Sequence, residues 1–146
     1  MKKLVLIGSL FVSAAALAQP ASPRPRDSMP GAADVSYVLK FDAPVAKKGA
    51  HAVAHLKITP GAGFHMNKEY PTSLALSPPD GVTLDKAKLT AKDAAKFEEK
   101  EALFDVAYTA NKPGKQTVTG ELKFAVCSAN SCDPKKSTVS FEIDVH

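Results

Sequence analysis

The sequence predicts an all-β protein, a β-sandwich of about seven or eight strands. Two observations predict it. Apolar and polar residues alternate over several short runs, which is the period of a strand with one buried face, and turn-forming residues separate those runs at short intervals. The length of 146 residues, with 45% hydrophobic and 23% charged residues, suits one globular domain with a buried core.

The alternation is clearest in Val35–Asp42, Ala50–Thr59, Lys115–Cys127 and Ser137–Val145, where nearly every second residue is apolar. Further candidate strands are Phe64–Asn67, Thr72–Ser77, Val82–Leu84 and Leu103–Ala110. Breakers that contain proline or glycine separate these runs, at Pro60-Gly61, Pro78–Gly81 and Lys112–Gly114. Many short strands with turns between them are typical of a sandwich.

The stretch Lys86–Ala102 is ambiguous. It is charged and alanine-rich, so it is compatible with one short helix. It fits a mobile loop equally well, with Phe97 as its aromatic residue. Periodicity does not choose between the two.

Residues 1–18 are predicted to be a secretory signal peptide. Two lysines precede an apolar run from Leu4 to Ala18, which is shorter than the roughly 20 residues of a membrane-spanning helix. Ala16-Leu17-Ala18 is a small-x-small cleavage site. Residues 19–33 contain four prolines and are predicted to be a flexible tether. The folded domain is then residues 34–146, periplasmic or secreted and not embedded in a membrane.

Charge and motifs exclude several classes of function. Removal of residues 1–18 leaves 17 basic against 15 acidic residues, a formal charge of +2. The lysines are scattered rather than clustered and are not interleaved with aromatic residues as a nucleic-acid platform requires, so nucleic acid is not an expected partner. The sequence has no nucleophile elbow, His-Glu-x-x-His motif or phosphate-binding glycine loop, which argues against conventional hydrolases and nucleotide enzymes. No cofactor is expected.

Cys127 and Cys132 are the most informative residues. One cysteine pair in an exported chain is expected to form a disulfide, and this pair brackets a tight connection between two long strands. The bond closes a ring of six residues, which is worth roughly 2 kcal/mol in chain entropy, and a sandwich of this size does not need it to fold. Two interpretations stay open: a redox-active pair, or a structural bond that fixes a loop.

The four histidines do not by themselves predict a metal site. His51 and His55 share a face of one strand but lie about 13 Å apart, too far to ligate one ion, and are expected to face solvent. His65 and Met66 together with the cysteines are residue types that suit copper. No histidine or methionine follows Cys127 closely, as a blue-copper loop would require. Copper binding stays a third hypothesis, and no metal ligand is assigned.

Several segments carry a resemblance to a known family: Gly63–Lys68, Leu74–Leu76, Pro79–Val82 and Phe124–Pro134. Through them, roughly Asp34–Val145 resembles the N-terminal periplasmic domain of the thiol:disulfide interchange protein DsbD. The resemblance implies an immunoglobulin-like fold whose cysteine pair cycles between dithiol and disulfide. In that family the domain accepts electrons from a thioredoxin-like domain and passes them to periplasmic oxidoreductases through mixed disulfides.

The resemblance also implies roles for individual residues. Cys132 would be the attacking thiol and Cys127 its resolving partner. Phe64 and His65 would lie beside the cysteines, and Lys92–Lys100, which includes Phe97, would form a cap loop over the pair. The cysteine spacing is one residue shorter than in one example of the family. The sequence carries neither a membrane electron-transport domain nor a thioredoxin-like domain. Either its reductant is a separate protein, or the domain has kept the fold and the disulfide and lost the electron relay.

The leading hypothesis is therefore a monomeric periplasmic thiol–disulfide exchange domain, at most an oxidoreductase relay. Its expected partners are thioredoxin-fold oxidoreductases or a membrane electron-transport protein. The rival hypothesis is an immunoglobulin-like binding or adaptor module in which the disulfide is purely structural.

Overall fold

Residues 35–146, the part of the chain that the computed structural model describes, form two antiparallel sheets of five strands each. The signal peptide and the tether predicted for residues 1–18 and 19–33 lie outside this range. The first sheet has the order β1 (Tyr37–Asp42), β2 (His51–Pro60), β8 (Glu101–Ala110) and β5 (Val82–Leu84), and β7 (Lys96–Glu98) also pairs with β8. The second has the order β10 (Cys132–Val145), β9 (Gly114–Cys127), β4 (Ser73–Ser77) and β6 (Lys88–Thr90), and β3 (His65–Met66) also pairs with β9.

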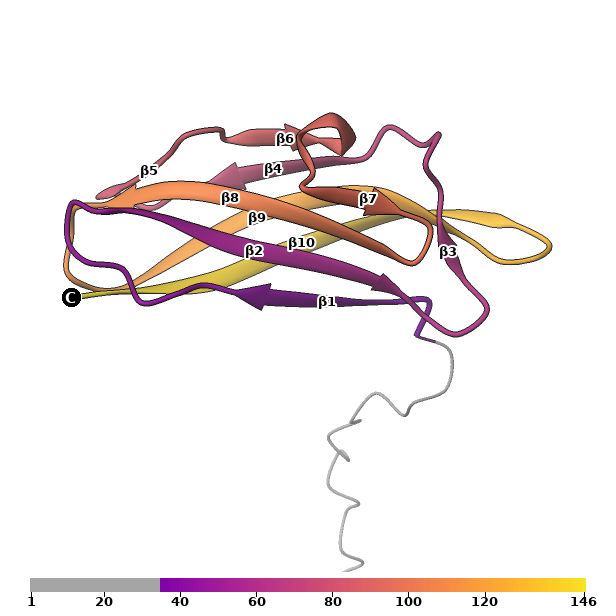
Figure 1. The fold of residues 1–146 in the computed structure, drawn as a ribbon, viewed down its shortest axis with the longest axis horizontal. Helices are drawn as coiled ribbons and strands as arrows, with labels where there is room; N and C mark the ends of the chain where they lie inside the picture. Colours follow the sequence, from indigo (N-terminus) through magenta and orange to yellow (C-terminus); the bar gives the residue numbers. More distant parts are fainter. Residues whose placement is uncertain (1–34) are drawn as a thin grey trace, which may run out of the picture. The chain divides into compact units, whose positions relative to one another are not determined.

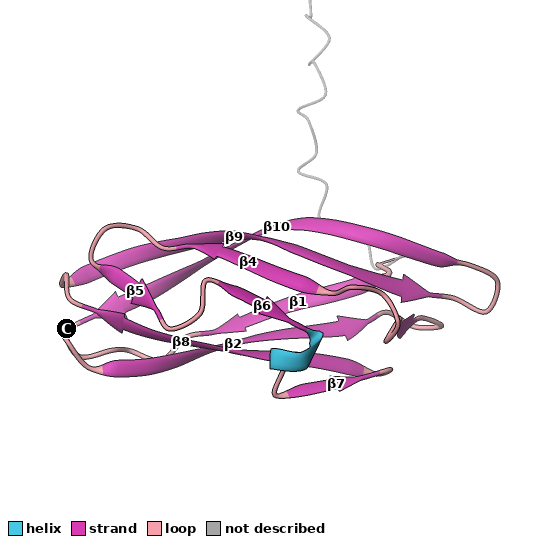
Figure 2. Cartoon of the chain, turned by 90° about the horizontal axis from the view of Figure 1, so that it is seen from above, coloured by secondary structure: helices cyan, strands magenta, loops and turns pink. Residues whose placement is uncertain are grey.

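The two sheets pack as layers around one core, which confirms the predicted β-sandwich (Figures 1 and 2). Strand alternation supplies this core, because every second residue of the long strands points inward. The largest fully buried side chains come from both sheets: Leu56, Ile58, Phe104, Val106 and Tyr108 from the first, and Leu74, Val118, Leu122, Phe124, Val126 and Ile143 from the second. Burying one such side chain stabilises the fold by about 1.5–3 kcal/mol.

Strand β1 joins the layers at one edge through aromatic contacts. The ring of Tyr37 meets that of Phe124 edge to face, with centroids 4.8 Å apart. The rings of Phe41 and Phe141 are stacked, with centroids 4.7 Å apart. Such aromatic pairs contribute about 0.5–1.5 kcal/mol of stability beyond the free energy gained by burying their surface. The edge strand β1 is therefore held by side-chain contacts as well as by its ladder to β2.

The stretch 86–102 is not the short helix that its composition allowed. It contains strands β6 and β7, and its helical part is only the single 3-10 turn η1 (Ala91–Asp93), which lies between them (Figure 2). Pairing explains the difference, because β6 forms a ladder with β4 and β7 forms one with β8. The side chain of Leu89 in β6 is 5% exposed and belongs to the core.

The last strand is longer than predicted. It begins at Cys132, where the sequence pattern placed its start at Ser137, and it pairs with β9 along its whole length. Pro134 is tolerated within it because β10 is the outermost strand of its sheet. The consequence is that both cysteines lie inside the ladder of one hairpin.

Candidate functional site

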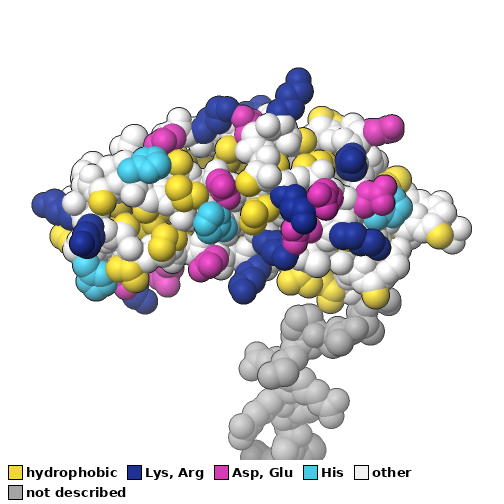
Figure 3. Space-filling view, in the orientation of Figure 1, with side chains coloured by type: hydrophobic (Ala, Val, Ile, Leu, Met, Phe, Trp, Pro, Cys, Tyr) yellow, Lys and Arg dark blue, Asp and Glu magenta, His cyan; other side chains and the backbone are white. Residues whose placement is uncertain are grey.

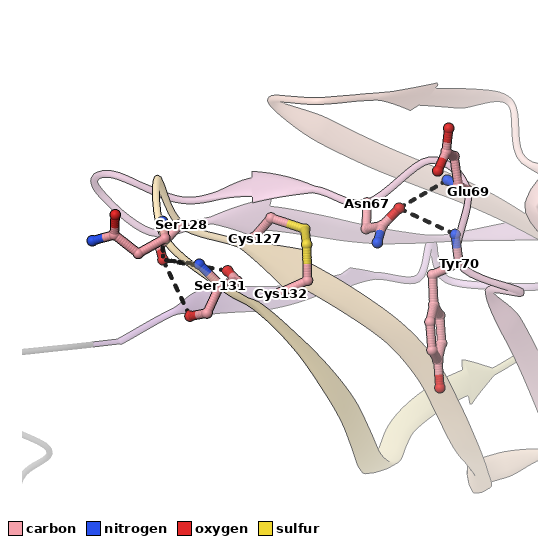
Figure 4. Close-up of a disulfide and its surroundings, with 8 residues drawn as sticks. Asn67, Glu69, Tyr70, Cys127, Ser128, Ser131 and Cys132 are labelled. Carbon is pink, nitrogen blue, oxygen red and sulfur yellow. Dashed lines mark hydrogen bonds between the residues drawn. A yellow bond between two sulfur atoms is a disulfide. The ribbon is translucent and has the colours of Figure 1, made fainter.

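The disulfide predicted between Cys127 and Cys132 is present, and it closes the end of the β9–β10 hairpin. The two residues are directly opposite each other, with Cα atoms 3.9 Å apart. Beyond them the connecting loop has its own hydrogen bonds: the backbone N–H of Ser128 donates to Ser131 O (2.8 Å), and the Ser128 hydroxyl oxygen accepts from the N–H of Ser131 (3.2 Å). Figure 4 shows these bonds on one side of the disulfide and the loop of Asn67 on the other.

The two cysteines differ in exposure. Cys127 is 5% exposed, whereas Cys132 is exposed to solvent. The topology explains the difference. Strand β3 covers Cys127 on one side, with His65 paired to it and Asn67 N–H donating to Ala125 O (2.9 Å). Strand β10 is the outer strand of its sheet, so within residues 35–146 Cys132 has no neighbouring strand beyond it.

A cavity of about 590 Å³ lies beside the disulfide. Three segments that are distant in the sequence line it: residues 65–69, Glu99, and the two cysteines. The backbone N–H of Met66 donates to Glu99 O (2.8 Å), which ties β3 to the turn between β7 and β8. Asn67 Oδ1 accepts from the N–H groups of Glu69 (2.9 Å) and Tyr70 (3.2 Å) and fixes the loop after β3 (Figure 4). The disulfide therefore faces a polar cavity with defined walls.

The structure places the predicted site residues unequally around this cavity. His65 lines it with Cys127 and Cys132. Phe64 and Phe97 are half-buried and pack against the hydrophobic core, and neither lines the cavity. The segment Lys92–Lys100 reaches the cavity through Glu99, which the sequence did not single out. The only feature of the sequence that pointed to Glu99 was its position inside Lys92–Lys100.

Ion pairs fix the segment 86–102: those of Glu101 join β7 and β8 to β2, and that of Asp93 lies within the segment. The Glu101 carboxylate lies 2.5 Å from Lys57 Nζ on β2 and 2.9 Å from Lys96 Nζ on β7. These two partners, Lys57 first, lower the pKa of Glu101 to about 2. The Asp93 carboxylate binds Lys86 and the N–H and hydroxyl of Thr90, which lowers the pKa of Asp93 to about 2.

We expect acid to weaken this attachment. Because the folded-state pKa of Glu101 is about 2 against an ordinary 4.5, its contribution to stability is complete above pH 4.5 and is lost as the pH falls toward 2. Thermal unfolding between pH 6 and pH 2 should show a smaller loss of stability in Glu101→Gln than in the unmodified protein. Glu142→Gln is the control, because the Glu142 side chain is 62% exposed and its carboxylate lies 3.8 Å from Lys115 Nζ, farther than the Glu101 carboxylate lies from its lysines. Equal pH dependence in Glu101→Gln and the unmodified protein would contradict this expectation.

The other histidines face solvent, as expected for His51 and His55. His51 Nε2 lies 3.0 Å from Asp85, and His55 Nδ1 lies 2.7 Å from Asp105. Figure 3 shows that histidines and charges of both signs are interspersed over the face of the molecule drawn there.

The copper hypothesis named Met66 as one of its residues, and Met66 is 1% exposed and buried in the core. Within residues 35–146, no three His, Cys, Asp or Glu residues are grouped so that they could hold a metal ion.

Fold and site together define the class of protein: a β-sandwich domain with one disulfide, which closes a hairpin beside a polar cavity. In residues 35–146 no helix has the length and apolar character needed to cross a membrane.

No family model matches the chain, and no curated protein matches it. Among solved structures, a conjugative transposon lipoprotein from Bacteroides eggerthii is similar with 10% sequence identity and a TM-score of 0.41, over 75% of this chain and 98% of the other. AggA, the major subunit of aggregative adherence fimbriae type I from Escherichia coli, has 11% identity and a TM-score of 0.37, over 75% and 95% of the two chains. A PapD-like domain of human CEP192 has 11% identity and a TM-score of 0.35, over 93% and 96%. TM-scores of 0.41 and below are too low for these proteins to bear on function.

Proposed function

We propose that this domain exchanges its Cys127–Cys132 disulfide with the cysteines of partner proteins. The observation that carries the proposal is the unequal exposure of the two cysteines beside a polar cavity. Exchange requires in-line access of a foreign thiolate to one sulfur, and the exposed Cys132 offers that access. A purely structural disulfide needs no exposed member and no cavity.

The chemistry consists of two displacements. A partner thiolate attacks Sγ of Cys132, the S–S bond breaks, and its electron pair goes to Sγ of Cys127. The partner's second thiolate then attacks its own sulfur in the mixed disulfide and releases Cys132. The partner's dithiol is thereby oxidised to a disulfide and the domain's disulfide is reduced to a dithiol. The same steps in reverse pass the electrons to an oxidised partner.

The arrangement of the segments that resemble the N-terminal domain of DsbD supports this proposal. Gly63–Lys68 and Phe124–Pro134 are distant in the sequence, yet His65 pairs with Cys127 and Met66 with Val126. We therefore propose thioredoxin-fold oxidoreductases, or a membrane electron-transport protein, as partners of an exported domain. The disulfide contributes only roughly 2 kcal/mol of chain entropy, so the sandwich is expected to remain folded while the bond is open.

A binding or adaptor module is the second candidate. The observation that favours it is the loop Ser128–Ser131, which has internal hydrogen bonds and extends beyond the other strands at that end of the sandwich (Figure 1). A disulfide across the base of such a loop would hold it in one conformation for a partner, and rigid loops lose less entropy on binding. This candidate requires no opening of the bond.

Trapping of a mixed disulfide tests the first candidate against the second. The Cys127→Ser variant keeps the exposed Cys132, and Cys132→Ser keeps the buried Cys127. Each is mixed, in its reduced form, with a thioredoxin-fold oxidoreductase that keeps one active-site cysteine, and that cysteine is activated as its mixed disulfide with thionitrobenzoate. We expect Cys127→Ser to release thionitrobenzoate at least 10-fold faster than Cys132→Ser, because attack depends on access.

The reduction potential of the unmodified protein, measured in glutathione buffers, completes the test. Exchange requires a potential within reach of periplasmic oxidoreductases, whereas a value below about −300 mV is typical of structural bonds. A potential in that low range, together with no mixed disulfide from either variant, would leave the adaptor as the function.

A further inference from the structure

His65 differs from the other histidines in its surroundings. His51, His55 and His146 each pair with an aspartate carboxylate. Within residues 35–146 the imidazole of His65 has no hydrogen-bond or ion-pair partner, although it is half-buried. It lines the cavity beside the disulfide instead. Its ring nitrogens are therefore available to a group in that cavity.

The strand register places His65 in a row with both cysteines. His65 of β3 and Cys132 of β10 are each directly opposite Cys127 of β9, from its two sides. Side chains directly opposite in antiparallel strands stand on the same face of the sheet, with Cβ atoms about 4.5–5.5 Å apart. All three side chains line the same cavity. The imidazole is thus a neighbour of the cysteine that the partner does not attack.

Breaking of the disulfide creates a charge that needs such a neighbour. Cys127 is 5% exposed, so water can stabilise its thiolate only weakly, and burial favours the protonated thiol. An imidazole can give that thiolate a proton, and can take the proton back when the thiol must act as a nucleophile.

We propose that His65 is the acid–base group of the exchange, and the proposal rests on the function proposed above. The incoming thiol loses its proton to His65, and its thiolate attacks Sγ of Cys132. The S–S bond breaks, the electron pair goes to Sγ of Cys127, and the imidazolium of His65 returns the proton to that sulfur. When the domain is reoxidised, His65 takes the proton from the Cys127 thiol, and the thiolate displaces the partner from Cys132.

The other charged groups around the cavity are placed less well for this role. Lys68 and Glu69 follow β3, and Glu99 lies in the turn between β7 and β8. All three are exposed, so water and salt screen their charges. None of them pairs with Cys127 in a strand ladder, as His65 does.

An NMR titration of the unmodified protein tests the proposal without any substitution. The imidazole pKa values of the four histidines are measured in the oxidised protein and after reduction with dithiothreitol. We expect the pKa of His65 to change by at least about half a unit between the two states, because a thiol or thiolate replaces the disulfide beside it. His51 and His55 are internal controls and should not change. An unchanged His65 would overturn the proposal.

A second measurement isolates the pair His65 and Cys127. In the Cys132→Ser variant, the thiolate of Cys127 is titrated by its absorbance at 240 nm, and its alkylation by iodoacetamide is timed at pH 7. Adding His65→Gln should raise the thiol pKa by about one unit and slow alkylation about 10-fold. Adding His55→Gln, the matched control, should change neither. Identical titrations with and without His65→Gln would overturn the proposal.

These outcomes are separable from failure of the proposed function. Dithiothreitol and iodoacetamide replace the protein partner in both measurements, so coupling between His65 and Cys127 is detected even if no oxidoreductase reacts. If His65 and Cys127 are coupled but no partner reacts, the exchange function is removed and the acid–base pair remains. If a partner reacts but His65 and Cys127 are not coupled, the exchange function remains and the acid–base role of His65 is removed.

Discussion

Replacement of Phe104 by alanine should cost about 3–5 kcal/mol of unfolding free energy, the range for loss of a buried aromatic ring. Phe104 is fully buried on β8, directly opposite Leu56 of β2. Strand β8 pairs with β2, β5 and β7, so the cavity would open at the centre of the first sheet. The surrounding strands are fixed by their ladders and cannot collapse into the space, which keeps the cost high.

Urea unfolding of the unmodified protein and of Phe104→Ala measures this loss of unfolding free energy. The expected loss corresponds to a decrease in melting temperature on the order of 12–20 °C for a domain of this size. Val38→Ala is the matched control, because Val38 is 55% exposed on β1 and its truncation should stay within about 0.5 kcal/mol. A loss below about 1 kcal/mol for Phe104→Ala would mean that the two sheets do not pack around this ring as described.

The sequence predicted the sandwich because its long strands carry the period-two pattern. Strands β1, β2, β9 and much of β10 each contain enough alternating residues to establish a buried face. Strands β6 and β7 have three residues each, too few to show any period. Their extended form comes from pairing with β4 and β8, a tertiary effect that local propensity does not contain.

The start of β10 could not be predicted for a related reason. Cys132–Lys136 is polar and contains a proline, so nothing in its composition indicates a strand. Its ladder is set by β9, whose residues from Lys123 to Cys127 pair with it. This pairing is what places Cys132 opposite Cys127.

The candidate site was predictable only in part. Cysteine count and the predicted export were enough to expect the disulfide, and it is present. The position of His65 next to Cys127 followed only from the family resemblance, because the two residues are 62 positions apart. Glu99 reaches the cavity through a backbone hydrogen bond between Met66 and the β7–β8 turn. No sequence pattern indicates such a contact between two sheets.

Gly120 is predicted to be the second site of large effect, because a side chain there would push two strands apart. Gly120 lies in the middle of β9, opposite Leu76 of β4 and Val139 of β10. A Cβ atom at Gly120 would lie 2.5 Å from the backbone oxygen of Ala75 and 2.8 Å from Leu76 Cδ2. The Leu76 side chain can move, but the Ala75 oxygen belongs to the backbone of β4 and cannot retreat without moving that strand.

The expected result is a loss of about 1–3 kcal/mol for Gly120→Ala, the usual cost of overpacking, and a larger loss for Gly120→Val. Strand propensity alone predicts the opposite sign, since glycine weakens a strand and valine favours it. Thr119→Val, at the exposed neighbouring position of the same strand, is the control and should stay within about 0.5 kcal/mol. Urea unfolding of the three variants decides between the two arguments, because stabilisation by Gly120→Val would mean that β4 yields to the new side chain.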